Sequence, residues 1–200
     1  MLKQLLLLFI LAIGLSTNVS AQKIKKLKEA NSSKKLSDEV SIIYGNFIHR
    51  IGSDNKYYAQ AVVLRNIITN EDYSLNVRAN YQRDTEKSFR FYIKPGMYKI
   101  HGYWYWTVKW LIGKEHYQLI FKDTDSALFD KIAVSDDIAN EYKLESYYIE
   151  IRPNSIYYLG TWDFSSGVVS FSDDKVDHDK NVSKIYRKIP FDQAITKLPE

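Results

Sequence analysis

The sequence predicts an all-β fold, an antiparallel β-sandwich of about 8–10 short strands followed by a short C-terminal helix. Three observations lead to this fold class. Two proline turns are flanked by aromatic and β-branched residues, short apolar segments recur between turn-forming residues, and a helical period appears near the C-terminus. Aromatic and β-branched side chains favour strands, and many short strands at this spacing are typical of sandwiches.

The two proline turns are Lys94–Met97 and Arg152–Ser155. Proline presets the backbone for the second position of a type I or II turn, and Gly96 or Asn154 can adopt the positive φ that type II needs at the third. These turns match the twist of a tight hairpin poorly. We therefore expect each turn to carry the chain from one sheet into the other.

Residues 1–21 have the layout of a secretory signal peptide, with Lys3, an apolar run from Leu5 to Leu15, and small residues before Ala21. We expect cleavage after Ala21, and a retained anchor is the alternative. The apolar run is shorter than the roughly 20 residues of a membrane-spanning helix, and no later segment is apolar enough to span. Residues 38–200 are expected to form one domain.

The segment between signal and domain, residues 22–37, is rich in lysine from Lys23 to Lys35. It is expected to be a solvated linker. The alternative is an electrostatic contact with an anionic surface, helped by Ile24 and Leu27.

The overall charge of +4 belongs to this beginning of the chain. Seven of the 28 Lys and Arg residues and one of the 24 acids precede Asp38, which leaves 21 bases and 23 acids in the domain. A nucleic-acid reader needs a basic face on the fold itself, so a nucleic-acid partner is not expected. The chain has no cysteine, which excludes a disulfide framework, a thiol nucleophile and a lipid-anchored cysteine.

The expected strands are short runs bounded by turn-forming residues. Gly45 lies inside the first and indicates a bulge or a close backbone approach. The segment Asp123–Asn140 is ambiguous between helix and strand. The candidate strands are Val40–His49, Tyr57–Asn66, Tyr73–Arg78, Phe89–Ile93, Met97–Thr107, Glu115–Lys122, Tyr147–Ile151, Ile156–Phe164 and Val168–Phe171.

Alternation along the strand after the first proline turn predicts which side chains share a face. The core face is expected to hold Tyr98, Ile100, Gly102, Trp104 and Trp106. The opposite face then holds Met97, Lys99, His101, Tyr103, Tyr105 and Thr107. On the next strand, apolar Tyr117, Leu119 and Phe121 are expected to lie opposite His116, Gln118 and Lys122.

The final helix is predicted from apolar residues at helical spacing. Pro190 should end it, and Asp177 or Asp179 should cap its start. Asp177, Asp179 and Asn181 also have the alternate spacing that begins a calcium loop, but the glycine and glutamate that such a loop needs later are absent. We expect a polar loop that caps the helix. The apolar residues are Val182, Ile185, Tyr186 and Ile189.

Three stretches resemble small exported β-sandwich proteins of Bacteroidetes-type bacteria, which are similar to prealbumin-like and carboxypeptidase-regulatory-like modules. They are Val40–Gly45, Ile93–Tyr98 and Ile151–Gly160. The resemblance covers roughly residues 40 to 165 and rests on turn chemistry. It implies export and a sandwich, and it implies no catalytic residue.

Two patterns would indicate an enzyme. His101 and His116 are expected on neighbouring strands, where with nearby carboxylates they would support metal-assisted or hydrolytic chemistry. Ser165–Gly167 follows Asp163, but no nucleophile-elbow pattern accompanies it.

The favoured function is an exported, non-enzymatic binding or accessory module of the cell envelope, either periplasmic or secreted. Exposed aromatic residues on a strand can stack on a sugar or anchor a peptide. The candidate binding residues are therefore Tyr103, Tyr105 and His101, together with Lys99. The alternative is that a second layer, the final helix or the segment Asp123–Asn140, covers them, because most large aromatic side chains of such a domain are buried. The partner would be a protein or glycan of the envelope, and no cofactor or metal is expected.

Overall fold

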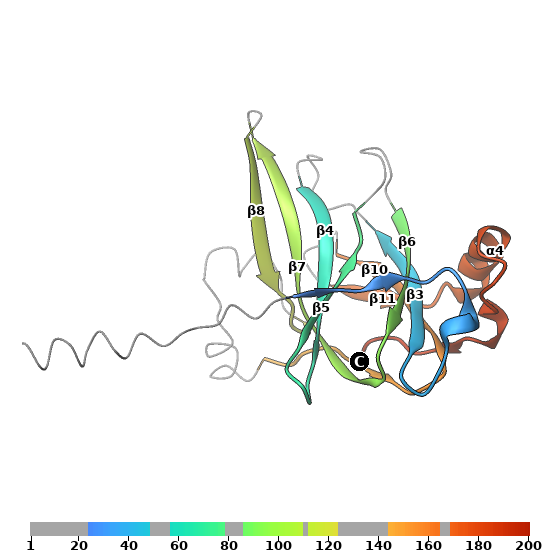
Figure 1. Ribbon diagram of the computed structural model, residues 1–200. Coiled ribbons are helices and arrows are strands. Elements are labelled where there is room, and N and C mark those ends of the chain that lie inside the picture. The colour runs from blue at the N-terminus through green and yellow to red at the C-terminus, as the bar shows by residue number, and fades with distance from the viewer. Residues whose placement is uncertain (1–23, 49–56, 79–85, 110–111, 124–143, 165–168) are drawn as a thin grey trace, which may run out of the picture.

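The computed structural model describes residues 24–48, 57–78, 86–109, 112–123, 144–164 and 169–200. The expected signal peptide, Lys23, Ser165–Gly167 and nearly all of the ambiguous segment lie outside these residues. The described strands form two six-stranded sheets that pack face to face (Figure 1).

Sheet A contains the long hairpin and the strands that flank it. Its order is β1 (Lys25–Lys26), β5 (Asp72–Asn76), β4 (Tyr57–Asn66), β7 (Gly96–Lys109) and β8 (Ile112–Leu119), with β9 (Tyr148–Ile151) also paired to β7. β8 pairs with the far end of β7 and β9 with its beginning.

Sheet B has the order β11 (Ser170–Ser172), β10 (Ile156–Asp163), β3 (Ser41–Ile48), β6 (Glu86–Ile93) and β2 (Lys28–Glu29), with β12 (Ile195–Thr196) paired to β10. In the described part of the chain the helices are α4 (Lys175–Ile185) and two 3₁₀ turns, η1 (Ser33–Lys35) and η2 (Phe191–Gln193). The all-β class with a short C-terminal helix is confirmed. The sheets are mixed, however, because β1–β5, β3–β10 and β10–β12 are parallel pairs.

Both proline turns arch between the sheets, as predicted. Pro95 lies between β6 of sheet B and β7 of sheet A, and Pro153 lies between β9 of sheet A and β10 of sheet B. Asn154 has the expected positive φ of 50°. The Tyr98 hydroxyl donates to the carbonyl of Lys94 at 2.8 Å and ties β7 back to the first turn. Because the turn at Pro153 carries the chain from sheet A into sheet B, β10 does not pair with β9. It pairs in parallel with β3 instead.

The inter-sheet core is rich in aromatic side chains. Trp162 is fully buried, and its ring meets Phe89 edge-on with centroids 5.2 Å apart. Its indole N–H donates to the carbonyl of Leu159 at 2.8 Å, so the polar group is satisfied. Trp162 and Phe89 belong to sheet B, and sheet A contributes Tyr73, Tyr98, Tyr103 and Tyr105 to the same core.

Gly45 marks a close backbone approach, as predicted. A Cβ atom there would lie 2.4 Å from the carbonyl oxygen of Gly160 and 2.8 Å from the ring of Phe89. Gly160 itself has φ +88°, and the register of β10 against β3 shifts between Tyr158 and Thr161. Glycine at both positions lets the two central strands of sheet B meet at this irregularity.

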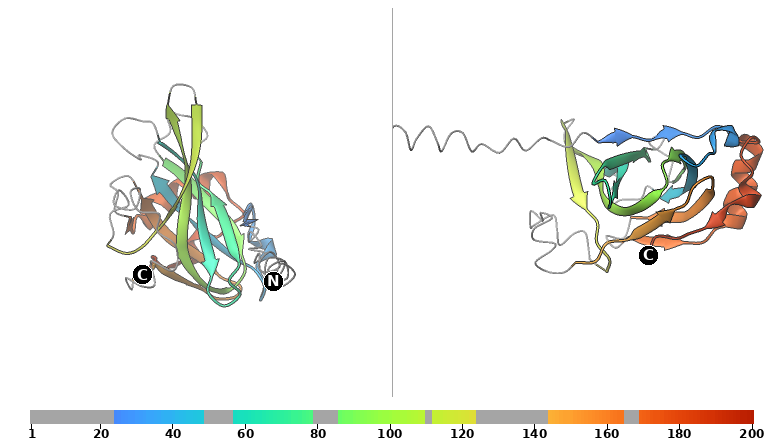
Figure 2. Two further views of the ribbon diagram at one scale, coloured as in Figure 1. Left: turned by 90° about the vertical axis from the view of Figure 1, so that its left-hand side faces the viewer. Right: turned by 60° about the horizontal axis from the view of Figure 1, so that its bottom comes forward.

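The lysine-rich segment is part of the fold, which corrects the prediction of a solvated linker. β1 adds to the edge of sheet A and β2 adds to the edge of sheet B. Between them, the Leu27 N–H donates to the carbonyl of Ser74 at 2.9 Å, and Leu27 packs against the inter-sheet core. Ala30 is fully buried. The strap, as we call residues 24–35, runs along one side of the sandwich from one sheet to the other (Figure 2, right).

The strap exists because both sheets leave an edge open on this side. An edge strand has a row of unpaired N–H and C=O groups, which a neighbouring segment satisfies. The far end is held by the Tyr92 hydroxyl, which donates to the carbonyl of Ser32 at 2.7 Å, and by the Ser33 N–H, which donates to the carbonyl of Lys188 at 3.0 Å. The contact of these lysines with an anionic surface stays a prediction.

Helix α4 covers the outer face of sheet B and makes the third layer (Figure 1). It begins at Lys175 and ends at Ile185, so Asp177 and Asp179 lie inside it and do not cap it. Ile185 is 71% exposed, which contradicts its expected place on the apolar face. The second core, between helix and sheet, contains Ala30, Ile42, Tyr44, Ile156, Tyr158, Val182, Ile189 and Phe191.

No helix among the described residues is both long and apolar enough to cross a membrane.

His178 gives the docking of α4 a dependence on pH. Its ring contacts those of Tyr44 and Tyr158, with centroids 5.9 and 5.7 Å away, and its Nε2 is buried without a hydrogen-bond partner. Burial lowers the pKa of His178 below its ordinary value of about 6.5, although Asp179, Glu86 and Asp174 act in the opposite direction. The neutral ring is therefore the form that fits this site.

We expect the protein to lose stability as the pH falls below about 6.5, because the unfolded chain takes up a proton on His178 that the folded chain resists. Above that pH the ring is neutral in both states and contributes no dependence. His178→Phe keeps an aromatic ring against the two tyrosines and should make the stability independent of pH in this range. Urea unfolding of both proteins between pH 5 and 7 tests this. Equal slopes against pH would contradict it.

Candidate functional site

A bulge in β7 decides which side chains reach the surface. Gly102 pairs with Val63 and Ile100 pairs with Leu64, so the register shifts by one residue at His101. One extra residue shifts every later side chain to the other face. The strict alternation that the sequence predicts therefore holds only up to Ile100.

Tyr103 and Tyr105 face the core, which corrects their predicted place on the outer face. Each is 4% exposed. The Tyr103 hydroxyl donates to Oε1 of Gln118 at 2.9 Å, and its ring stacks on Tyr105 with centroids 5.3 Å apart. Its other neighbour is Phe164, edge-on at 5.5 Å. These tyrosines close the core at the β7–β8 end of the sandwich.

His101 and His116 are on neighbouring strands but do not converge. His116 pairs with Tyr105 and stacks on it, with centroids 5.0 Å apart, so it shares the inner face. His101 is 7% exposed and its ring lies 6.2 Å from that of Tyr117, on the outer face. The two are also about 13 Å apart along the strands, four residues at about 3.4 Å each. Within the described residues, no group of three or more His, Cys, Asp or Glu side chains is placed to hold a metal ion.

The acidic segment is helical. Alternate residues of a helix point about 200° apart, so Asp177, Asp179 and Asn181 do not converge on one cation. Asp179 is used in packing, because it accepts a hydrogen bond from the Tyr44 hydroxyl at 2.7 Å and pairs with the Lys175 ammonium group. The segment holds α4 on sheet B.

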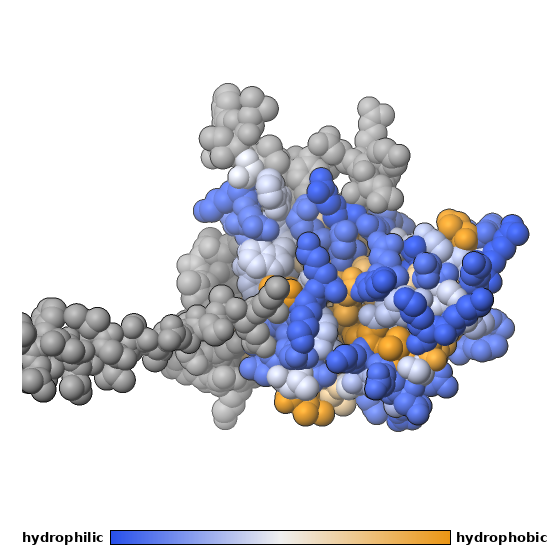
Figure 3. All heavy atoms as spheres, in the orientation of Figure 1, coloured by the Kyte–Doolittle hydropathy of each residue, from blue (hydrophilic) through white to orange (hydrophobic). Residues whose placement is uncertain are grey.

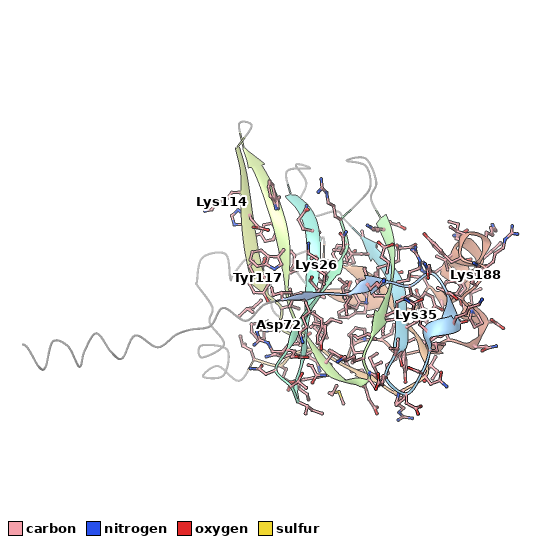
Figure 4. The ribbon with its side chains drawn as sticks, in the orientation of Figure 1. Lys26, Lys35, Asp72, Lys114, Tyr117 and Lys188 are labelled. Carbon is pink, nitrogen blue, oxygen red and sulfur yellow. The ribbon has the colours of Figure 1, made fainter. Side chains whose placement is uncertain are left out.

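The bulge places Trp104 and Trp106 on the outer face of sheet A, beside Tyr117 of β8. Trp106 is 43% exposed and Tyr117 is 37% exposed. Trp104 pairs with Tyr117 across the strands, and their ring centroids are 4.7 Å apart. We call Trp104, Trp106 and Tyr117 the aromatic strip. It lies on the hairpin that projects beyond the rest of the sandwich (Figure 1), and Tyr117 is labelled on β8 in Figure 4.

Two glycines leave room for rings of the strip to pack against the neighbouring strand. A Cβ atom on Gly113 would lie 2.8 Å from the Trp106 ring, and one on Gly102 would lie 2.8 Å from the Tyr117 ring. Each ring therefore rests directly against the backbone of the neighbouring strand. This contact fixes the ring position before any ligand arrives and lowers the entropy cost of binding.

Glu115 gives the strip a polar neighbour. It is exposed and pairs with Trp106, so it shares the outer face with the rings. A carboxylate beside exposed aromatic rings can accept hydrogen bonds from hydroxyl groups while the rings supply apolar contact. Pale side chains over β7 and β8 next to charged, blue ones show this mixed character in Figure 3.

Sequence reasoning selected the right strand and the wrong face. The available signal was the pair Gly102 and Gly113, which lie in otherwise aromatic and β-branched strands. Glycine in a strand interior often marks a bulge or a close approach.

No family model matches the chain, and no curated protein matches its sequence. Among solved structures, a leucine-rich repeat protein from Bacteroides thetaiotaomicron VPI-5482 aligns with a TM-score of 0.34 and 8% sequence identity. The alignment covers 77% of this chain and 16% of that protein. A similarity this low carries no argument about fold or function, so the function must be inferred from the described surface itself.

Proposed function

We propose that the protein is an exported binding module of the cell envelope, and that it binds a carbohydrate chain on the aromatic strip. The observation that carries this proposal is the outward display of Trp104, Trp106 and Tyr117 on one face of β7 and β8. Export is supported by the layout of residues 1–21.

A carbohydrate suits the strip because aromatic faces are electron-rich and the C–H groups of a sugar ring carry partial positive charge. Trp104 and Trp106 are two residues apart on β7, which separates them by about 7 Å. Successive rings can thus contact successive parts of a chain. Glu115 lies where it can accept hydrogen bonds from sugar hydroxyls. An apolar peptide side chain has no donor for this carboxylate.

The strip also differs from a protein–protein core. Trp106 and Tyr117 are 43% and 37% exposed, the charged Glu115 shares their face, and the hairpin lies apart from the body of the sandwich. Protein interfaces are depleted of charged residues at their centre and bury a continuous patch. An open strip of separate rings fits a chain that passes across it.

Pull-down with insoluble polysaccharides and with purified peptidoglycan tests the proposal, using the chain from Gln22 onward. Trp106→Ala and Tyr117→Ala should each weaken binding by roughly tenfold, since contact with one large ring is worth about 1.5 kcal/mol. Tyr148→Ala is the matched control, because Tyr148 is an exposed tyrosine on β9 at 42%. Binding that survives the strip substitutions, or falls equally with the control, would contradict the proposal.

A further inference from the structure

A hollow lies beside β6, far from the aromatic strip. Its volume is about 260 Å³, just below the roughly 300–1,000 Å³ of pockets that hold drug-sized ligands. It is therefore sized for a small group. The lining residues are Glu29, Asn76, Glu86, Lys87, Ser88, Phe89, Arg90, Phe91 and Tyr186.

The hollow lies along the part of the β6 edge that β2 does not pair with. β2 pairs with β6 at Phe91 and Tyr92, and the Ala30 N–H donates to the carbonyl of Arg90 at 3.1 Å. No described strand pairs with β6 on this side before Arg90. Backbone polar groups alternate along a strand, so the N–H and C=O of Ser88 point to the same side as the carbonyl of Arg90. The Ser88 N–H is thus a donor directed towards the hollow.

Arg90 is a positioned cation with an unused donor. Its guanidinium carbon lies 3.3 Å from the centroid of the Tyr186 ring, and its Nη2 lies 3.5 Å from Oε2 of Glu29. Its Nε is buried and has no hydrogen-bond partner. An unsatisfied buried donor costs free energy, and an acceptor that enters the hollow would remove that cost.

Lys87 adds a second cation. Its side chain is half-buried, and that burial lowers its pKa, with the positive charges of Arg90 and Arg78 acting in the same direction and Glu29 against it. Glu86 already accepts a hydrogen bond from the Asn46 amide at 2.9 Å. The lining thus carries two cations, Lys87 and Arg90, and two carboxylates, of which Glu86 already accepts a hydrogen bond from Asn46.

We propose that this hollow binds a small anionic group, a carboxylate or a phosphate, through Lys87, Arg90 and the backbone N–H of Ser88. The anion satisfies donors that the fold leaves unused, the Arg90 Nε–H and the Ser88 N–H. Glu29, whose side chain is 56% exposed, can move aside as the anion pairs with Arg90.

Titration of the chain from Gln22 onward with sodium phosphate and with sodium acetate, at constant ionic strength, tests the site. NMR signals of the Ser88 amide and of the Arg90 Nε–H should shift and saturate. Lys87→Gln should weaken binding by roughly tenfold through the loss of a charge-assisted contact. Lys114→Gln, a change at an exposed lysine on β8, should leave it unchanged.

Saturation by phosphate alone would identify a phosphate site, and saturation by acetate as well would identify a carboxylate site; both support the proposal. Absence of saturable shifts at Ser88 with either anion would overturn it, as would unchanged affinity in Lys87→Gln. If that variant does not fold, the Arg90 Nε–H signal of the unmodified chain decides, because an anion bound in the hollow must shift it.

Discussion

Replacing Tyr105 with alanine is expected to destabilise the protein by about 3–5 kcal/mol, the usual cost of truncating a buried aromatic side chain. Replacing its neighbour Trp106 is expected to cost about 1 kcal/mol or less, as at most exposed positions. The exposed fractions of the two side chains, 4% and 43%, set this order. Urea unfolding of both variants measures the difference.

Tyr105→Phe is the control, because it keeps the ring that stacks on Tyr103 and His116 and should cost far less than the alanine change. The pair of alanine variants tests the bulge at His101 directly. Strict alternation along β7 would put Trp106 in the core and Tyr105 outside. A larger loss for Trp106→Ala would therefore show that the strand has no bulge there.

The sequence predicted what local chemistry controls. Turns at Pro95 and Pro153 follow from the backbone preferences of proline and its successor, and the structure places both between the sheets. Most strand positions agree too, since aromatic and β-branched runs favour strands wherever they pair. The close backbone approach at Gly45 was also predicted, because a glycine among bulky strand residues often marks such an approach.

The unpredicted features depend on residues distant in sequence. The bulge at His101 arises from the pairing of β7 with β4. Gly102 beside it indicates an irregularity, but a glycine alone does not show that the register shifts or which face the later side chains take. The two-residue strands of the strap carry lysines and little apolar surface, so they show no periodicity. They form because two sheets leave neighbouring edges open. The bulge also explains why Tyr103 and Tyr105 are buried and why the exposed rings are those of the aromatic strip.

A chain that begins at Asp38 is expected to be less stable than one that begins at Gln22 by about 3 kcal/mol. It lacks β1, β2 and η1, and with them the burial of Ala30 and the packing of Leu27 on the core, which together account for roughly this free energy. Urea unfolding of the two chains measures the loss. The shorter chain should also self-associate, because both sheet edges become available for pairing with another molecule.

Lys26→Gln together with Lys28→Gln in the longer chain separates backbone pairing from charge. Both lysines are exposed, so the double variant should keep the stability of the unmodified chain. Equal urea midpoints for the chains that begin at Gln22 and Asp38 would show that the segment is a tether. Cleavage after Ala21 would leave three residues before β1, so an exported protein would retain the whole strap. The lysines of the segment would then be held on the surface of the domain by β1 and β2, which pair with the edge strands β5 and β6.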